Sequence, residues 1–159
     1  RTASLLEVAD ARSGSDQIHI VSWARHSAAK TDQRADMIKG SCLCGDITFE
    51  TAATPMGASM CHCWQCRKQS GGIWSSAYVA RGDLRITGDV RWFASSPKAK
   101  RGSCPCCGSF LFWAANAEGT ISFALGAVDG PTGLHLEKHI FVAEKGDYYD
   151  IAVGIEQQE

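Results

Sequence analysis

Three groups of closely spaced cysteines constrain this chain more than any other feature of its sequence. The central group, Cys61-His62-Cys63-Trp64-Gln65-Cys66, places three thiols within six residues. A buried cysteine packs as a small hydrophobic side chain, and packing alone gives no reason for such crowding. A soft metal ion bound by thiolates is therefore the first function to consider for this group.

The remaining grouped cysteines form two pairs that lie far apart in the chain. Cys42 and Cys44 enclose one residue, whereas Cys104 and Cys107 enclose two, with Cys106 between them. Zn²⁺ prefers tetrahedral sulfur ligands, and two such pairs complete a closed site of the structural kind. The central group then supplies three ligands and leaves one position open, which is typical of a catalytic zinc. The count predicts two metal ions with different roles, and iron is the alternative metal, since tetrahedral sulfur sites accept both.

Disulfide pairing is the alternative use of the eight cysteines. Their spacing, in a chain without a visible secretory signal, favours metal or redox sites in a reducing compartment, so we expect a cytoplasmic location. The formal net charge of −1 gives no electrostatic reason to expect nucleic acid or an anionic membrane as partner. The apolar runs are also far shorter than the roughly 20 residues of a membrane span.

The composition of the chain changes near Met37. Residues 1–36 contain no cysteine and mix small, polar and charged side chains. We interpret them as a poorly ordered extension or linker, and Met37 as the natural start of a zinc-binding domain over residues 37–159. The alternative is a helix or strand that packs on this domain.

The domain itself has the pattern of short strands joined by turns. Strands are expected at residues 46–51, 73–80, 84–87, 90–94, 110–113, 121–125, 139–142 and 148–151. A short helix is expected at residues 64–69, where Ser70-Gly71-Gly72 ends it. This spacing predicts a mainly antiparallel β domain with few short helices. Because such a domain has a limited core, a structural metal would add stability that apolar burial does not supply.

Four motifs together resemble a known family. They are Gly40-Ser41-Cys42-Leu43-Cys44-Gly45, the central group continued to Gly71, Cys104-Pro105-Cys106-Cys107-Gly108-Ser109, and Gly126-Ala127-Val128-Asp129-Gly130-Pro131. Their order and spacing resemble the glutathione-dependent formaldehyde-activating enzyme family, also called the centromere protein V family. The resemblance implies a small antiparallel zinc-binding β domain of the β-tent (Mss4-like) kind. The chain departs from the family at Ser103, where an aromatic residue is frequent, at Tyr148, where tryptophan is usual, and in the extra thiol of Cys106.

The same resemblance implies how the cysteines are shared between two zinc ions. Cys42, Cys44, Cys104 and Cys107 would hold a structural zinc, and Cys61, Cys63 and Cys66 a catalytic one. This division agrees with the ligand count given above.

The resemblance also implies a function. The family's named reaction adds glutathione to formaldehyde and gives S-hydroxymethylglutathione. We therefore expect a zinc-dependent carbon–sulfur lyase or synthase that acts on a glutathione–aldehyde adduct or a related thiol adduct. Three thiolates on zinc suit such a substrate, because its thiol completes a tetrahedral sulfur set and is deprotonated on binding. Polarisation of the aldehyde oxygen by the zinc is the alternative role of the metal. The alternatives are a carrier of the adduct, a non-enzymatic zinc module that binds protein or chromatin, and a thiol redox or metal-buffering protein.

Several residues near the cysteines have two interpretations. Arg67 and Lys68 are candidate contacts for the carboxylates of glutathione, or they belong to a solvated helix face. His62 is favoured as a structural or supporting residue, with a fourth ligand or a proton shuttle as the alternative. Cys106 is either a spare thiol or a replacement for one member of the downstream pair.

The aromatic and remaining histidine side chains give weaker signals. Trp64, Trp74, Trp92 and Trp113 either line a pocket or belong to the core, and core positions are commoner in a small β domain. His135 and His139 show no ligand spacing, so surface or core roles are expected for both.

Overall fold

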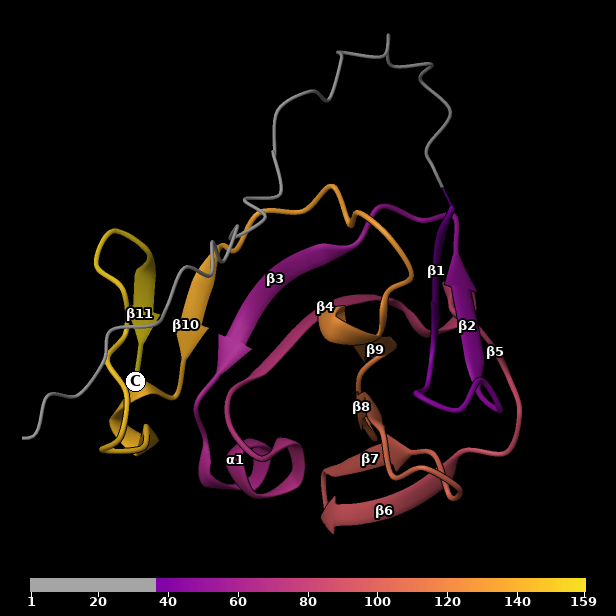
Figure 1. Cartoon of the computed structure of the whole chain (residues 1–159), viewed down its shortest axis with the longest axis horizontal. Helices are drawn as coiled ribbons and strands as arrows, with labels where there is room; N and C mark the ends of the chain where they lie inside the picture. Colours follow the sequence, from indigo (N-terminus) through magenta and orange to yellow (C-terminus); the bar gives the residue numbers. More distant parts are fainter. Residues whose placement is uncertain (1–36) are drawn as a thin grey trace, which may run out of the picture. The chain divides into compact units, whose positions relative to one another are not determined.

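The computed structural model describes residues 37–159, which form two β-sheets and one short α-helix (Figure 1). The strands are β1 (Ile38–Ser41), β2 (Thr48–Thr51), β3 (Met56–Cys61), β4 (Trp74–Ala80), β5 (Arg85–Thr87), β6 (Arg91–Ser96), β7 (Ala99–Ser103), β8 (Phe110–Ala115), β9 (Thr120–Ala124), β10 (Lys138–Ile140) and β11 (Glu156–Gln158). The helices are α1 (Trp64–Ser70) and three 3-10 turns, η1 (Arg81–Asp83), η2 (Leu125–Ala127) and η3 (Val142–Glu144). The interpretation of residues 1–36 as an extension lies outside the described residues.

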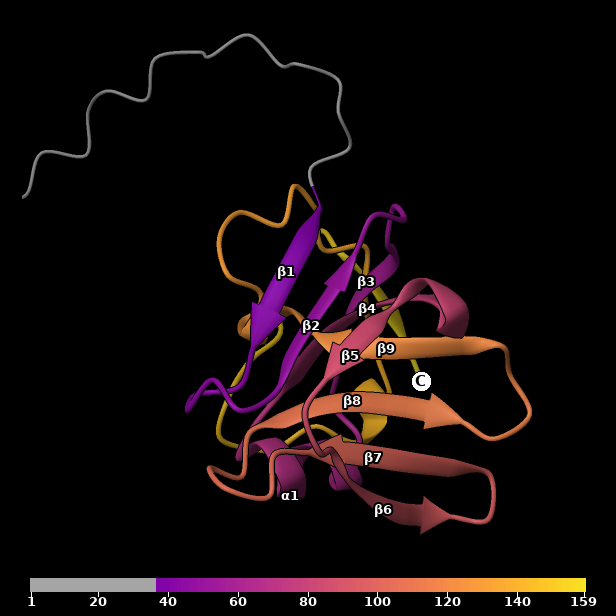
Figure 2. The ribbon, with the colours of Figure 1, turned by 90° about the vertical axis from the view of Figure 1, so that its right-hand side faces the viewer.

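The strand order confirms the mainly antiparallel β fold. Strands β1, β2 and β5 form a small antiparallel sheet, and the larger sheet has the order β11-β10-β3-β4-β9-β8-β7-β6. Figure 2 shows β9, β8, β7 and β6 side by side in the larger sheet. One edge differs from the expectation, because β10 pairs parallel with both β3 and β11. Strands β10 and β11 are each three residues long, which is too short for a clear apolar alternation.

Aromatic side chains join the two sheets. Phe49 on β2 lies with its ring centroid 5.5 Å from that of Phe112 on β8 and 5.5 Å from that of Phe123 on β9. Burial of each such side chain stabilises the fold by about 1.5–3 kcal/mol. The fully packed centre of this core is made by Ile47, Phe49, Ala77, Val79, Leu111, Phe112, Ala114 and Phe123.

Helix α1 has clear local causes for both of its ends. The Sγ of Cys63 accepts a hydrogen bond from the backbone N–H of Cys66 at 3.4 Å, which caps the first turn. At the other end Gly71 adopts the left-handed conformation with φ of 78° and donates its N–H to the carbonyl of Arg67. The expected helix and its glycine stop are thereby confirmed, and the cap places two thiols of the central group next to each other.

The expected strands differ from the structure at one predicted segment, residues 148–151, and at four strands that were not predicted, β1, β3, β7 and β11. The segment expected as a strand at 148–151 is a turn followed by irregular chain, and the last strand is β11 further on. Strand β7 was not expected, because Ala99-Lys100-Arg101-Gly102-Ser103 lacks an apolar alternation. Antiparallel hydrogen bonding to β6 and β8 stabilises β7 as a strand, although its own sequence does not predict one.

Candidate functional site

Cys42, Cys44, Cys104 and Cys107 come together as the sequence predicts. Their Sγ atoms all lie within 4.8 Å of one another. The Sγ of Cys44 is 3.5 Å from that of Cys42 and 3.7 Å from that of Cys104. Tetrahedral zinc with bonds of about 2.3 Å would place its sulfur ligands roughly 3.8 Å apart, so this donor set fits the metal.

Local contacts lower the pKa of Cys42 and of Cys107. The pKa of Cys44 is raised instead, because the backbone hydrogen bond at Asp46, which lowers it, is outweighed by burial and the neighbouring thiols. The backbone N–H of Ile47 donates to Cys42 Sγ at 3.3 Å, and that of Cys107 donates to Cys104 Sγ at 3.5 Å. The hydroxyl of Ser109 lies 3.2 Å from Cys107 Sγ, and hydrogen bonding to Ser109 lowers the pKa of Cys107 to about 5. Since only thiolates bind the metal, these contacts prepare Cys42 and Cys107 for it.

Cys106 lies outside this tetrahedral set. Its Sγ is within 4.8 Å of Cys44 Sγ and of a carboxylate oxygen of Asp46, and all three residues are exposed. This position agrees with the interpretation of Cys106 as a spare thiol.

Cys61, Cys63 and Cys66 form the second group, again with all Sγ atoms within 4.8 Å of one another. Cys61 ends β3, Cys63 caps α1, and Cys66 lies in the first turn of that helix. Hydrogen bonding between Cys61 and Cys66 lowers the pKa of the Cys66 thiol to about 6 and raises that of Cys61. Three thiols at these separations fit a zinc ion with one open position.

A cavity of about 970 Å³ opens over the three-cysteine group. All three cysteines line it, whereas no member of the four-cysteine group does. Its aromatic lining consists of Trp64, Trp74, Tyr78, Trp113 and Phe141, and its charged lining of Lys98, Arg101, Glu118, Lys138, Glu144 and Glu159. Of the four tryptophans considered in the sequence analysis, Trp64, Trp74 and Trp113 line this cavity, whereas Trp92 packs near Phe112.

Arg101 is a residue of this site that the sequence did not indicate. It lies on β7, is 4% exposed, and directs Nη1 to Cys66 Sγ at 3.5 Å and Nη2 to Gln65 Oε1 at 2.9 Å. Its separation from Cys66 by 35 positions gives no local pattern.

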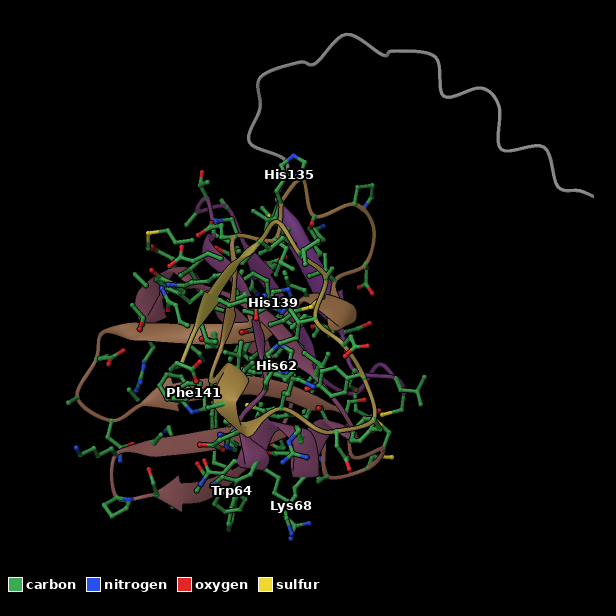
Figure 3. All side chains as sticks on the ribbon, turned by 90° about the vertical axis from the view of Figure 1, so that its left-hand side faces the viewer. His62, Trp64, Lys68, His135, His139 and Phe141 are labelled. Atoms are coloured by element: carbon green, nitrogen blue, oxygen red, sulfur yellow. The ribbon has the colours of Figure 1, made fainter. Side chains whose placement is uncertain are left out.

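His62 lies between Cys61 and Cys63 in the chain, and its side chain is fully buried next to that of His139 (Figure 3). Its Nδ1 is 2.6 Å from the hydroxyl of Tyr149, and its Nε2 is 2.9 Å from Nδ1 of His139. Burial, followed by the nearby charges of His139 and Lys145, lowers the pKa of His62. Because both ring nitrogens have hydrogen-bond partners, the geometry supports the structural interpretation of His62 over that of a metal ligand.

The other predicted polar residues lie away from the cavity. Neither Arg67 nor Lys68 lines it, and Lys68 projects from α1 into solvent (Figure 3). Their contact with substrate stays a prediction. His135 is exposed, which fits a surface role, and His139 is buried next to His62, which fits a core role.

Comparison with known proteins gives the same family as the cysteine motifs. The model of the family described as glutathione-dependent formaldehyde-activating enzyme matches residues 37–144. An uncharacterized lyase of Schizosaccharomyces pombe is 28% identical over 121 residues, which cover 72% of this chain and 85% of that protein. The crystal structure of a Rhodobacter sphaeroides protein aligns with a TM-score of 0.49 at 24% identity and covers 58% of this chain and 89% of that one.

The match begins at Met37, and it includes every cysteine discussed above. Within the part of the chain that the structure describes, no helix is long and apolar enough to cross a membrane. The cytoplasmic location, the absence of a nucleic-acid partner and the domain start at residue 37 stay predictions. The family match covers well over half of the chain, and the chain therefore belongs to the glutathione-dependent formaldehyde-activating enzyme family.

Proposed function

We propose that this protein is a zinc-dependent carbon–sulfur lyase or synthase that joins a thiol such as glutathione to an aldehyde such as formaldehyde. The observation that carries this proposal is the opening of Cys61, Cys63 and Cys66 onto the large cavity. The four-cysteine group is excluded from that cavity, which fits a division into one structural and one catalytic ion. The family match and the lyase-named relative support a reaction of this class.

The proposed reaction is an addition without redox change. The sulfur of the thiol forms a bond to the carbonyl carbon, the C=O π bond breaks, and the thiol proton moves to the carbonyl oxygen. Cleavage of the adduct reverses each change. Zinc held by the three cysteines would supply an open ligand position and would favour the thiolate form of a substrate thiol near neutral pH.

The chain's own residues would hold the reactants. Trp64, Trp74 and Trp113 line the cavity and would shield the reacting sulfur from bulk water. Lys98 and Lys138 also line it and are available for the carboxylates of glutathione, with Arg67 and Lys68 as the contacts that the sequence suggests.

The experiment that tests the proposal combines metal counting with an exchange assay. Native mass spectrometry and metal analysis are applied to the wild type, to Cys63→Ser and to Cys106→Ser. We expect two zinc ions in the wild type and in Cys106→Ser, and one in Cys63→Ser with the fold retained. Because the adduct also forms without an enzyme, exchange between glutathione and S-hydroxymethylglutathione is then measured by NMR. Faster exchange is expected with the wild type and with Cys106→Ser, but not with Cys63→Ser.

Other outcomes would favour other functions. A single zinc ion, or unfolding of Cys63→Ser, would mean that the three-cysteine group is structural. Two ions without faster exchange would favour a non-enzymatic zinc module or a carrier of the adduct. Disulfide formation under mild oxidant with release of one ion would favour a thiol redox or metal-buffering protein. Iron in place of zinc would appear directly in the metal analysis.

A further inference from the structure

Within the part of the chain that the structure describes, Arg101 is a buried positive charge without a carboxylate partner. Among residues 37–159 the ion pair found is that of Arg85 with Glu50, at 3.0 Å on the surface. Arginine does not lose its proton in proteins, and a buried charge is costly unless an opposite charge lies close to it. Some other group near Arg101 must therefore carry negative charge.

The contacts of the guanidinium identify that group. Nη1 reaches the sulfur of Cys66, and Nη2 is held by the side-chain oxygen of Gln65. Gln65 is itself fixed, because its amide donates to the backbone carbonyl of Ser95 at 3.2 Å. The Phe110 ring lies 5.7 Å from the guanidinium carbon and carries no charge. Among the residues that the structure describes, the three-cysteine group is thus the nearest source of negative charge.

The charges of that group explain why a cation belongs there. Three thiolates and one divalent ion sum to −1, and a fourth thiolate from a substrate would bring the sum to −2. A neighbouring guanidinium offsets one unit of this charge, and at 4% exposure the Arg101 side chain is little screened by water.

We propose that Arg101 is the positioning residue that balances the charge of the three-cysteine centre, so that the centre accepts the thiolate of its substrate. This inference rests on the proposed function. In this inference Arg101 offsets the charge of the substrate thiolate, and other cations of the cavity bind the substrate carboxylates. Nη1 and Nη2 of Arg101 already contact Cys66 Sγ and Gln65 Oε1, which directs the guanidinium at the cysteine group, and its buried Nε has no hydrogen-bond partner among the described residues.

The test measures thiol binding and metal retention rather than turnover. The protein is loaded with cobalt(II), and binding of glutathione and of the uncharged thiol 2-mercaptoethanol is followed by the sulfur-to-cobalt absorption. The variants are Arg101→Gln, which removes the charge, and Arg101→Lys, which keeps it. Lys100→Gln is the matched control, because it removes a positive charge from the same strand at a side chain that does not line the cavity. Release of cobalt to a chelator is measured in parallel.

We expect Arg101→Gln to weaken the binding of both thiols by a similar factor, about tenfold or more. Arg101→Lys should restore most of that loss, and Lys100→Gln should leave the binding of both thiols unchanged. Loss of glutathione binding alone in Arg101→Gln would overturn the inference, because it would show a carboxylate contact. Unchanged binding of both thiols would overturn it as well.

Two further results separate this inference from the proposed function. If the wild type shows no spectral change with either thiol, the proposed function fails, and faster cobalt release from Arg101→Gln then decides the role of Arg101. If Arg101→Gln does not fold, thiol binding by Arg101→Lys decides whether Arg101 balances the charge of the centre. Binding of both thiols within about threefold of the wild type supports charge balance, whereas a large loss for either thiol contradicts it.

Discussion

Removal of the Tyr149 hydroxyl would test how much its hydrogen bond to His62, the residue between Cys61 and Cys63, stabilises the fold. That hydroxyl lies 2.6 Å from Nδ1 of His62, a side chain with 0% exposure. The other ring nitrogen of His62 is already occupied by His139. Tyr149→Phe keeps the aromatic ring, whose centroid lies 5.6 Å from that of His62, and removes one hydrogen bond.

The size of the effect follows from burial. A buried nitrogen left without a partner costs about 1–3 kcal/mol, because the unfolded chain can still hydrogen-bond it to water. Replacement of an exposed polar group changes stability by less than about 0.5 kcal/mol. Tyr148→Phe is the matched control, since Tyr148 is the adjacent tyrosine and is 66% exposed.

The assay is urea unfolding of the metal-loaded protein, with metal content measured before each experiment. We expect Tyr149→Phe to lower the free energy of unfolding by about 1–3 kcal/mol with an unchanged dependence on urea. Tyr148→Phe should unfold as the wild type does. Equal stability of the two variants would refute the reasoning, because the His62–Tyr149 hydrogen bond would then contribute nothing to the fold.

Three further predictions use the same unfolding assay. Leu111→Ala, at a fully buried position, should cost about 2–5 kcal/mol, whereas Leu43→Ala, at 89% exposure, should cost less than about 0.5 kcal/mol; similar losses would contradict the core assignment. Gly88→Ala should destabilise by more than about 1 kcal/mol, because its φ of 98° is left-handed and a Cβ there would collide with a backbone carbonyl, while Gly119→Ala meets open space and should be tolerated. Burial lowers the pKa of His62, so below about pH 6.5 the unfolded chain takes up a proton that the folded state resists. Stability should therefore fall as the pH drops through that range, and it should fall less steeply in His62→Gln.

The sequence alone determined the parts of the site that depend on local spacing. Cys61, Cys63 and Cys66 are close in the chain, and the turn that brings them together is made by the Cys63 cap and ended by Gly71. Cys-x-Cys and Cys-x-x-Cys spacings likewise place each distant pair on a single turn. Metal-ligand spacing, turn glycines and strand alternation are properties of a few neighbouring residues, so they can be read without the fold. For this reason the family, the mainly β class and the two cysteine groups were predictable.

Only the tertiary structure decided what surrounds the three-cysteine group. Arg101 reaches Cys66 because β7 pairs with β8 in a particular register, and the sequence of β7 has no pattern that specifies this pairing. Tyr149 was assigned to a strand, yet its side chain turns inward to His62 across 87 positions of chain. Contacts of this kind depend on long-range strand pairing and on the competition of buried polar groups for partners, which no short stretch of sequence contains.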